Sequence, residues 1–188
     1  LRSDIPELPD DKKKRLIDEF KISAYEATIL VSDIETAKYF EEVVAKMGKN
    51  RDMKLAVNWI TGELFAVLNN KNLEISESPI SAKNLAKLIN LIKNGTISGK
   101  IAKTIFELMM DGDKDPQIIV EEKGLKQESD PKALEALIDK IINDNREKAI
   151  EYKNGKEKLF GFFVGQAMKI SGGKANPKLI NEILKKKL

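Results

Sequence analysis

The chain has 188 residues, of which 41% are hydrophobic and 34% are charged, and its formal net charge is +3. This composition excludes wholesale disorder, and the length allows one medium domain or two small ones. The sequence contains no histidine and no cysteine, which excludes disulfides, thiolate nucleophiles, histidine bases and the usual zinc, iron and copper sites.

The start of the sequence and its apolar runs lead to an expected location. No signal peptide opens the chain, and no apolar run approaches the roughly 18–20 residues that a bilayer span requires. The absence of cysteine fits a reducing compartment, so the expected location is the cytoplasm, with no membrane partner. The chain begins with Leu1 rather than Met and continues into the Pro-spaced segment IPELPDD, which indicates a piece of a longer protein.

Apolar residues recur at helical spacing along nearly the whole chain, as in Leu85, Leu88, Ile89 and Ile92. No convincing period-2 strand pattern is present. The predicted fold is therefore all-α. Helices are expected near residues 10–20, 33–47, 51–70, 81–94, 98–111, 116–123, 131–153, 157–170 and 177–187.

Start signals for helices support this interpretation. Four residues can each act as an N-cap, and proline follows three of them at the favoured first helical position. Trp59 lies in the middle of a predicted helix among apolar residues, so we expect it to anchor the core rather than to serve a function. The four capping residues are Ser81, Asp115, Asp130 and Asn176.

The segment GLKQESDP, residues 124–131, is the expected joint between two domains. It combines a glycine that can stop a helix with a new N-cap and a proline. The charge balance changes there as well. Residues 1–129 contain 20 Lys/Arg and 22 Asp/Glu, whereas residues 130–188 contain 13 Lys/Arg and 8 Asp/Glu. Positive charge is thus concentrated in the last third of the chain.

The stretch DGDKDPQIIVEE resembles a calcium-binding loop in its spacing of carboxylates. Pro116 occupies the sixth position, however, where glycine makes the sharp turn of such loops. The simpler interpretation is an acidic loop in which Asp115 caps the next helix, and no metal site is expected. The carboxylates at positions 1, 3, 5 and 12 are Asp111, Asp113, Asp115 and Glu122.

Catalytic groups are not predicted. Adjacent carboxylates such as Glu41 and Glu42 point about 100° apart on a helix and cannot converge on one reacting bond. The stretch GTISGK, residues 95–100, has glycine and lysine in a phosphate-loop-like order, but it lacks the full spacing and a preceding strand. We expect a capped turn between two helices there.

The bend GQAMKISGGKANPKLINEIL offers a possible anion site. Gly172, Gly173 and the amides after Asn176 can present several N–H groups to a phosphate. An alternative of equal weight is a glycine helix stop followed by an Asn-Pro helix start. Residues 153–188 hold nine lysines against two glutamates, and this excess favours a polyanion. Three lysines flank the bend: Lys169, Lys174 and Lys178.

Several stretches can be compared with a known family: IPELPDDKKKRLIDEF, KLAVNWITGEL, SPISAKNLAKLINLIKNGTISGKIAKTIFELM, DPQIIVEEKGLKQESD and FGFFVGQAMKISGGKANPKLINEIL. Together and in order, they resemble the C-terminal part of GatB, the B subunit of aspartyl/glutamyl-tRNA amidotransferase. ISGKIAK and GGKANP are specific in combination. The resemblance implies a helical-bundle domain at 1–128 and a tail domain of three to four helices at 129–188, related to the free-standing YqeY proteins.

In that family an N-terminal cradle activates the side-chain carboxylate of a misacylated tRNA with ATP and transamidates it, using ammonia from a partner amidase. The resemblance implies that the cradle is left out here, so no catalytic residue maps to this chain. ATP and Mg are expected only for the cradle, and no cofactor is expected here. The implied partners are tRNA of the Asn type, the Gln type or both, together with the amidase and a small third subunit of the parent enzyme.

The family's tail helps to hold the elbow of the cognate tRNA, so the resemblance implies binding and positioning of misacylated tRNA for glutamine-dependent transamidation. A second hypothesis is a protein-interaction module, in which 1–129 docks an amidase or another subunit and the basic tail is incidental. The tail's role carries over to the matching positions Lys169, Gly172, Gly173, Lys174, Asn176 and Pro177. Charge alone, not the motif, adds Lys153, Lys156, Lys158 and Lys178.

Overall fold

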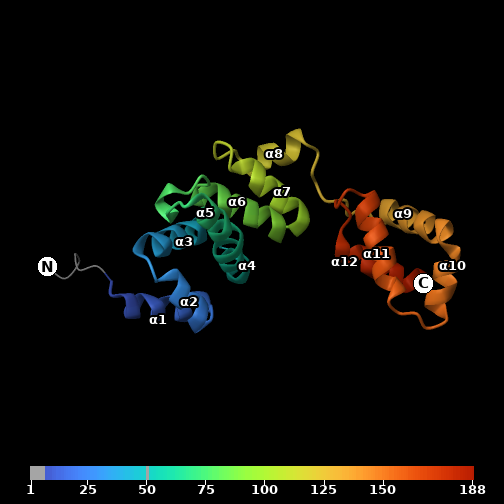
Figure 1. Ribbon diagram of the computed structural model, residues 1–188, viewed down its shortest axis with the longest axis horizontal. Coiled ribbons are helices and arrows are strands. Elements are labelled where there is room, and N and C mark those ends of the chain that lie inside the picture. Colours follow the sequence, from blue (N-terminus) through green and yellow to red (C-terminus); the bar gives the residue numbers. More distant parts are fainter. Residues whose placement is uncertain (1–6, 50) are drawn as a thin grey trace. The chain divides into compact units, whose positions relative to one another are not determined.

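The computed structural model of the protein describes residues 7–49 and 51–188. Within these ranges the secondary structure is helical, apart from turns and one isolated bridge between two extended residues. The predicted all-α fold is confirmed. The chain divides into two compact units, and Figure 1 labels their helices. The first unit takes in the described residues up to Lys93 and Phe106–Ile118, and the second takes in Asn94–Ile105 and Ile119–Leu188.

The first unit is built from short and medium helices. Most of them begin at a residue whose side chain accepts a hydrogen bond from the first helical turn, as Asp33 does from Thr36 N at 2.8 Å. Two further helices, α7 (Gly99–Met109) and α8 (Pro116–Glu122), contribute residues to both units. The helices that lie wholly in the first unit are α1 (Pro9–Phe20), α2 (Ala24–Leu30), α3 (Ile34–Lys46), α4 (Met53–Asn58), α5 (Phe65–Lys71) and α6 (Ala82–Lys93), with a π-helical segment at Trp59–Leu64 and a 3-10 turn at Ile75–Glu77.

The core of the first unit includes the contact between α3 and α6. Phe40 on α3 and Leu85 on α6 are fully buried there. Trp59 is only 6% exposed, and its ring lies 5.5 Å from that of Phe106. The expectation that Trp59 anchors the core is confirmed.

The acidic loop before α8 is tied to α6 by its own carboxylates. Asp113 Oδ1 accepts a hydrogen bond from Ser81 N at 2.9 Å, and the Asp113 carbonyl accepts one from Asn84 Nδ2 at 2.8 Å. Asp115 forms an ion pair with Lys87 and also accepts from the amide that follows Pro116, at 3.0 Å. The predicted capping role of Asp115 is confirmed. In the described ranges no group of three or more acidic side chains is arranged to hold a metal ion.

The second unit contains the four C-terminal helices. A single helix over 131–153 was predicted, but the structure breaks it at Asn145, where φ is −130° and ψ is 42°. The Asn145 side chain donates to the Ile141 carbonyl at 2.9 Å, an alternative to the helical backbone bond that favours termination. The helices are α9 (Pro131–Asp144), α10 (Arg146–Lys153), α11 (Leu159–Ile170) and α12 (Pro177–Lys187).

The core of the second unit is formed by α9, α11 and α12, with one alanine from α10. Its central side chains, including Ile138, Phe163 and Ile180, are fully buried. Residues 94–105 and 119–128 belong to this unit by their contacts. That residues 129–188 form a domain of their own stays a prediction. None of the helices in the described ranges combines the length and the apolar character that a membrane span requires.

Candidate nucleic-acid interface

The predicted contact residues lie at the two ends of α11. One group occupies the end of α10 and the following loop, and the other runs from the last turn of α11 to the first turn of α12. With 12 residues, α11 is about 18 Å long. The structure therefore gives two groups rather than one cluster. The first group is Lys153, Lys156 and Lys158, and the second is Lys169, Gly172, Gly173, Lys174, Asn176 and Lys178.

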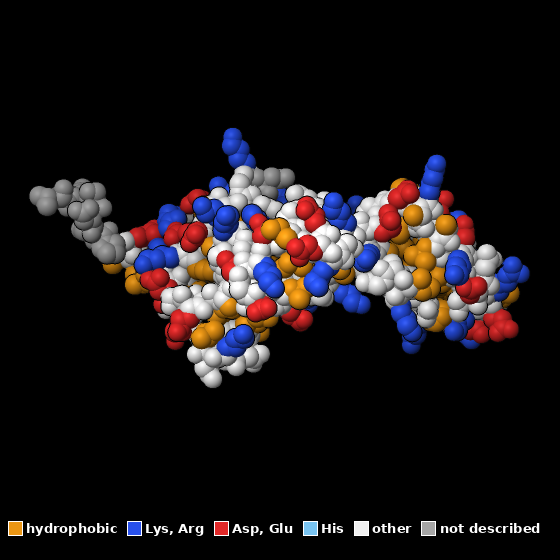
Figure 2. Space-filling view, turned by 90° about the horizontal axis from the view of Figure 1, so that it is seen from above, with side chains coloured by type: hydrophobic (Ala, Val, Ile, Leu, Met, Phe, Trp, Pro, Cys, Tyr) orange, Lys and Arg blue, Asp and Glu red, His pale blue; other side chains and the backbone are white. Residues whose placement is uncertain are grey.

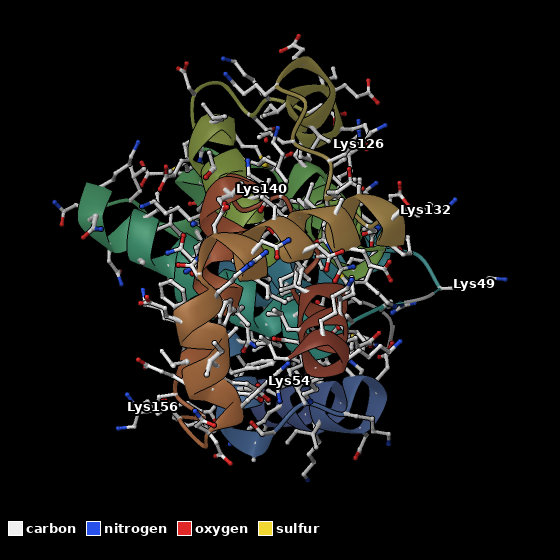
Figure 3. The ribbon with its side chains drawn as sticks, turned by 90° about the vertical axis from the view of Figure 1, so that its right-hand side faces the viewer. Lys49, Lys54, Lys126, Lys132, Lys140 and Lys156 are labelled. Atoms are coloured by element: carbon white, nitrogen blue, oxygen red, sulfur yellow. The ribbon has the colours of Figure 1, made fainter. Side chains whose placement is uncertain are left out.

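The first group is exposed and is partly neutralised. Lys153, Lys156 and Lys158 all lie on the surface, and Figure 3 shows Lys156 projecting outward from its loop. Lys156 Nζ lies 3.0 Å from a carboxylate oxygen of Glu151. An exposed ion pair of this kind contributes little to stability. The Glu151 carboxylate nevertheless reduces the positive charge that a phosphate approaching Lys156 would meet. Lys153 and Lys158 have no ion pair within the described ranges.

The two adjacent glycines end α11. Gly172 N donates to the Lys169 carbonyl at 3.1 Å, and Gly173 N donates to the Met168 carbonyl at 2.7 Å. Both glycines have positive φ, 61° and 81°, in the left-handed region that glycine enters without strain. This is a glycine helix stop, and both of its amides are already hydrogen-bonded.

The amides that follow the glycines also have partners. Lys174 N donates to the Ser171 carbonyl at 3.1 Å, and Ala175 N donates to Ser171 Oγ at 3.1 Å. Asn176 Oδ1 then accepts from the first amides of α12, at 3.1 and 3.4 Å. Of the two alternatives for this bend, the structure shows the glycine helix stop followed by the Asn-Pro start, and these use the backbone amides. An anion would meet the lysine side chains instead.

The segment expected to be the domain joint is paired with the bend. Glu128 N donates to the Lys174 carbonyl at 2.7 Å, and Asn176 N donates to the Glu128 carbonyl at 2.9 Å, which makes a parallel bridge between Glu128 and Ala175. Asn176 Nδ2 also donates to Ser129 Oγ at 3.2 Å. Asn176 thus holds two segments together besides capping α12.

A third segment joins the bend at the start of α7. Ser98 Oγ donates to the Gly173 carbonyl at 3.1 Å in a buried position, and it accepts from Ile101 N at 3.2 Å. Gln127 N donates to the Thr96 carbonyl at 2.7 Å. The stretches ISGKIAK and GGKANP therefore meet in the second unit, through a hydrogen bond between residues that are 75 positions apart in the sequence.

Sequence reasoning missed Lys100 at this junction. A Cβ built on Gly173 would lie 3.3 Å from Lys100 Cδ, so the methylene chain of Lys100 lies over this glycine. Lys100 is exposed and has no ion pair within the described ranges. The glycine-lysine order of GTISGK was the available signal, but it gave no indication that GGKANP would lie beside it.

Lysine side chains on the second unit are not confined to the predicted set. Figure 3 shows Lys132 and Lys140 extending from α9 and Lys126 from the segment before it. Figure 2 shows lysine and arginine side chains interspersed with acidic ones on the visible surface of each unit. Specific contacts must therefore be distinguished from general positive charge by comparing individual lysines.

Comparison with known proteins agrees with the motifs. Residues 38–188 match the family described as the GatB domain (GatB_Yqey). The B subunit of aspartyl/glutamyl-tRNA(Asn/Gln) amidotransferase from Pelagibacter ubique (strain HTCC1062) is 94% identical over 188 residues, which are 100% of this chain and 38% of that protein. The proteins of the same name from Ehrlichia chaffeensis and Zymomonas mobilis are 50% and 47% identical, again over 100% of this chain and over 38% and 39% of their own lengths. The chain thus spans less than two fifths of the relatives it matches, and it belongs to the GatB domain family.

Proposed function

We propose that this chain is the tRNA-holding part of the GatB subunit of an aspartyl/glutamyl-tRNA amidotransferase. The names of its relatives support the assignment to this subunit. The observation that carries the proposal is the group of lysines around the bend: Lys169, Lys174 and Lys178 have no ion pair within the described ranges, on a backbone whose own amides are satisfied. Unpaired cations on an ordered surface suit the phosphates of a folded RNA.

The chain's part in the reaction is positioning rather than chemistry. Lysine contacts to phosphate carry no base information, so the tail recognises tRNA by its backbone and shape. Holding the tRNA body would place its misacylated end for glutamine-dependent transamidation to Asn-tRNA or Gln-tRNA. We assign ATP, Mg and the catalytic residues to the part of the parent protein that the resemblance places outside this chain, and we assign the amidase and the small third subunit as partners of that parent. We place the activity in the cytoplasm.

The test replaces the three lysines of the bend together by alanine. Because each bound phosphate releases counterions, the salt slope of tRNA binding is expected to fall by roughly 0.7–0.9 for each phosphate that the variant no longer binds. Affinity is measured by fluorescence anisotropy of a labelled tRNA transcript, titrated with the full 188-residue chain at three salt concentrations.

A matched control removes the same charge from the first unit. Lys14, Lys46 and Lys71 are exposed and have no ion pair within the described ranges, and their replacement by alanine is expected to leave the salt slope unchanged. Equal slopes for the two triple variants would contradict a tRNA site at the bend.

A further inference from the structure

The side-chain stem of Lys100 packs against the bend at Gly173. Besides its Cδ at 3.3 Å, Lys100 Cε lies 3.7 Å from a Cβ built on Gly173. The ammonium group is one bond beyond Cε, so it lies beside the GGKANP stretch although it belongs to a different motif. Glycine at 173 leaves the room that the lysine stem occupies.

The backbone on both sides of this contact is fixed by hydrogen bonds. Ser98 Oγ binds the Gly173 carbonyl on one side and the Ile101 amide on the other. The backbone at Lys100 therefore lies in a turn capped by Ser98 Oγ, and the Lys100 stem packs on Gly173, whose carbonyl accepts from the same hydroxyl. A long lysine side chain loses rotamer freedom when it binds a ligand, and packing of its stem reduces that cost here.

We propose that Lys100 binds a phosphate of the RNA backbone together with Lys169 and Lys174, on one surface built jointly by residues 98–100 and the bend. This proposal rests on the tRNA-binding role above and adds a contact from outside the tail. The three lysines share two features. Each is without an ion pair within the described ranges, and each lies on or against the bend, whose backbone amides are already hydrogen-bonded. An ammonium group binds phosphate as a point charge, so such lysines suit consecutive phosphates of one strand.

The proposal changes the boundary of the RNA-binding part. The tail helices alone carry Lys169 and Lys174, whereas Lys100 comes from the start of α7. RNA binding then depends on the Ser98–Gly173 hydrogen bond, which keeps the two stretches together. The second unit as a whole, rather than residues 129–188, is the functional element.

The experiment replaces Lys100 by methionine, which keeps the packed stem and removes the charge. With the full chain and a labelled tRNA transcript, Lys100→Met is expected to weaken binding several-fold and to lower the salt slope by roughly 0.7–0.9. Lys100→Arg keeps a positive charge and is expected to retain most of the affinity. The matched control is Lys140→Met on α9, an exposed lysine without an ion pair in the described ranges, which is expected to bind like the unsubstituted chain.

The outcomes separate this proposal from the tRNA-binding role. If Lys100→Met binds like the unsubstituted chain while Lys174→Met binds less well, the joint surface is wrong and the tRNA role stands. If Lys140→Met weakens binding as much as Lys100→Met, the binding depends on general charge and the site is wrong. If the unsubstituted chain does not bind tRNA even at low salt, both proposals fall. Far-UV circular dichroism of each variant checks that the helices are intact.

Discussion

Gly173 is a single residue on which two separate constraints act. Its φ of +81° lies in the left-handed region, and a Cβ there would come within 3.3 Å of Lys100 Cδ. Its neighbour Gly172 also has positive φ, +61°, but a Cβ there would meet nothing within 4 Å. Both glycines therefore need a left-handed backbone conformation, but only Gly173 also needs the space that a Cβ would take.

Alanine at these two positions is expected to have unequal effects on stability. Gly172→Ala should cost about 1 kcal/mol, the usual penalty of a left-handed conformation for a residue with a Cβ. Gly173→Ala should cost more, because the Lys100 stem must also move. Urea unfolding followed by far-UV circular dichroism measures both. Equal losses would show that the contact with Lys100 places no demand on residue 173.

At the scale of single elements, the structure differs from expectation where local signals are short or compete. The seven-residue helix α2 was not predicted, because it is too brief to show apolar periodicity. Its start signal was nevertheless present as Ser23 followed three residues later by Glu26. The break at Asn145 arises from competition between a side chain and the backbone, which spacing of apolar residues does not report.

The capping box of α2 should make the stability of the first unit depend on pH. Ser23 N donates to Glu26 Oε2 at 2.7 Å, and this hydrogen bond lowers the pKa of Glu26 below its ordinary value. A group with a lowered folded-state pKa contributes stability above its unfolded pKa, and the contribution is lost as the pH falls through the folded-state pKa. Glu26→Gln should therefore lose less stability than the unsubstituted chain between pH 7 and about pH 3.

The same box can be tested at constant pH. Ser23→Ala removes the acceptor for Glu26 N, which lies 3.2 Å from Ser23 Oγ, and is expected to cost about 1 kcal/mol at pH 7. Urea unfolding followed by the fluorescence of Trp59, the one tryptophan of the chain, reports both variants. If Glu26→Gln and the unsubstituted chain respond equally to acid, the hydrogen bond from Ser23 N does not contribute to folding.

At the scale of the whole molecule, the sequence predicted the helical class and most helices, because apolar spacing and N-caps are local signals. It also identified the bend, but it gave equal weight to free and bonded amides there. The structure decides in favour of bonded amides, most of which have local partners such as the Met168 and Lys169 carbonyls. The sequence could not report the remote partners Ser98 and Glu128, which bind the carbonyls of Gly173 and Lys174. No local pattern reports such pairings, so Lys100 could not be placed beside Gly173 without the structure.

The two units have distinct reporters, which makes their independence measurable. The buried residues of the core formed by α9, α11 and α12 run from Leu134 to Leu184, whereas Trp59 lies in the first unit. Ile138→Ala, a large-to-small change at a fully buried position of this core, is expected to cost about 2–5 kcal/mol. Because a domain this small is marginally stable, part of the helical signal should be lost at lower urea while the Trp59 transition stays in place.

The matched variant is Ile89→Ala on α6, which is equally buried but lies in the first unit. It is expected to shift the Trp59 transition to lower urea, because its cavity opens in the unit that contains the reporter. If Ile138→Ala moves the fluorescence and circular dichroism transitions together, the helices shared by both units, α7 and α8, couple them into one cooperative structure. In that case the tail does not unfold as a domain of its own, and a change in tRNA affinity caused by a core variant would report loss of the whole fold.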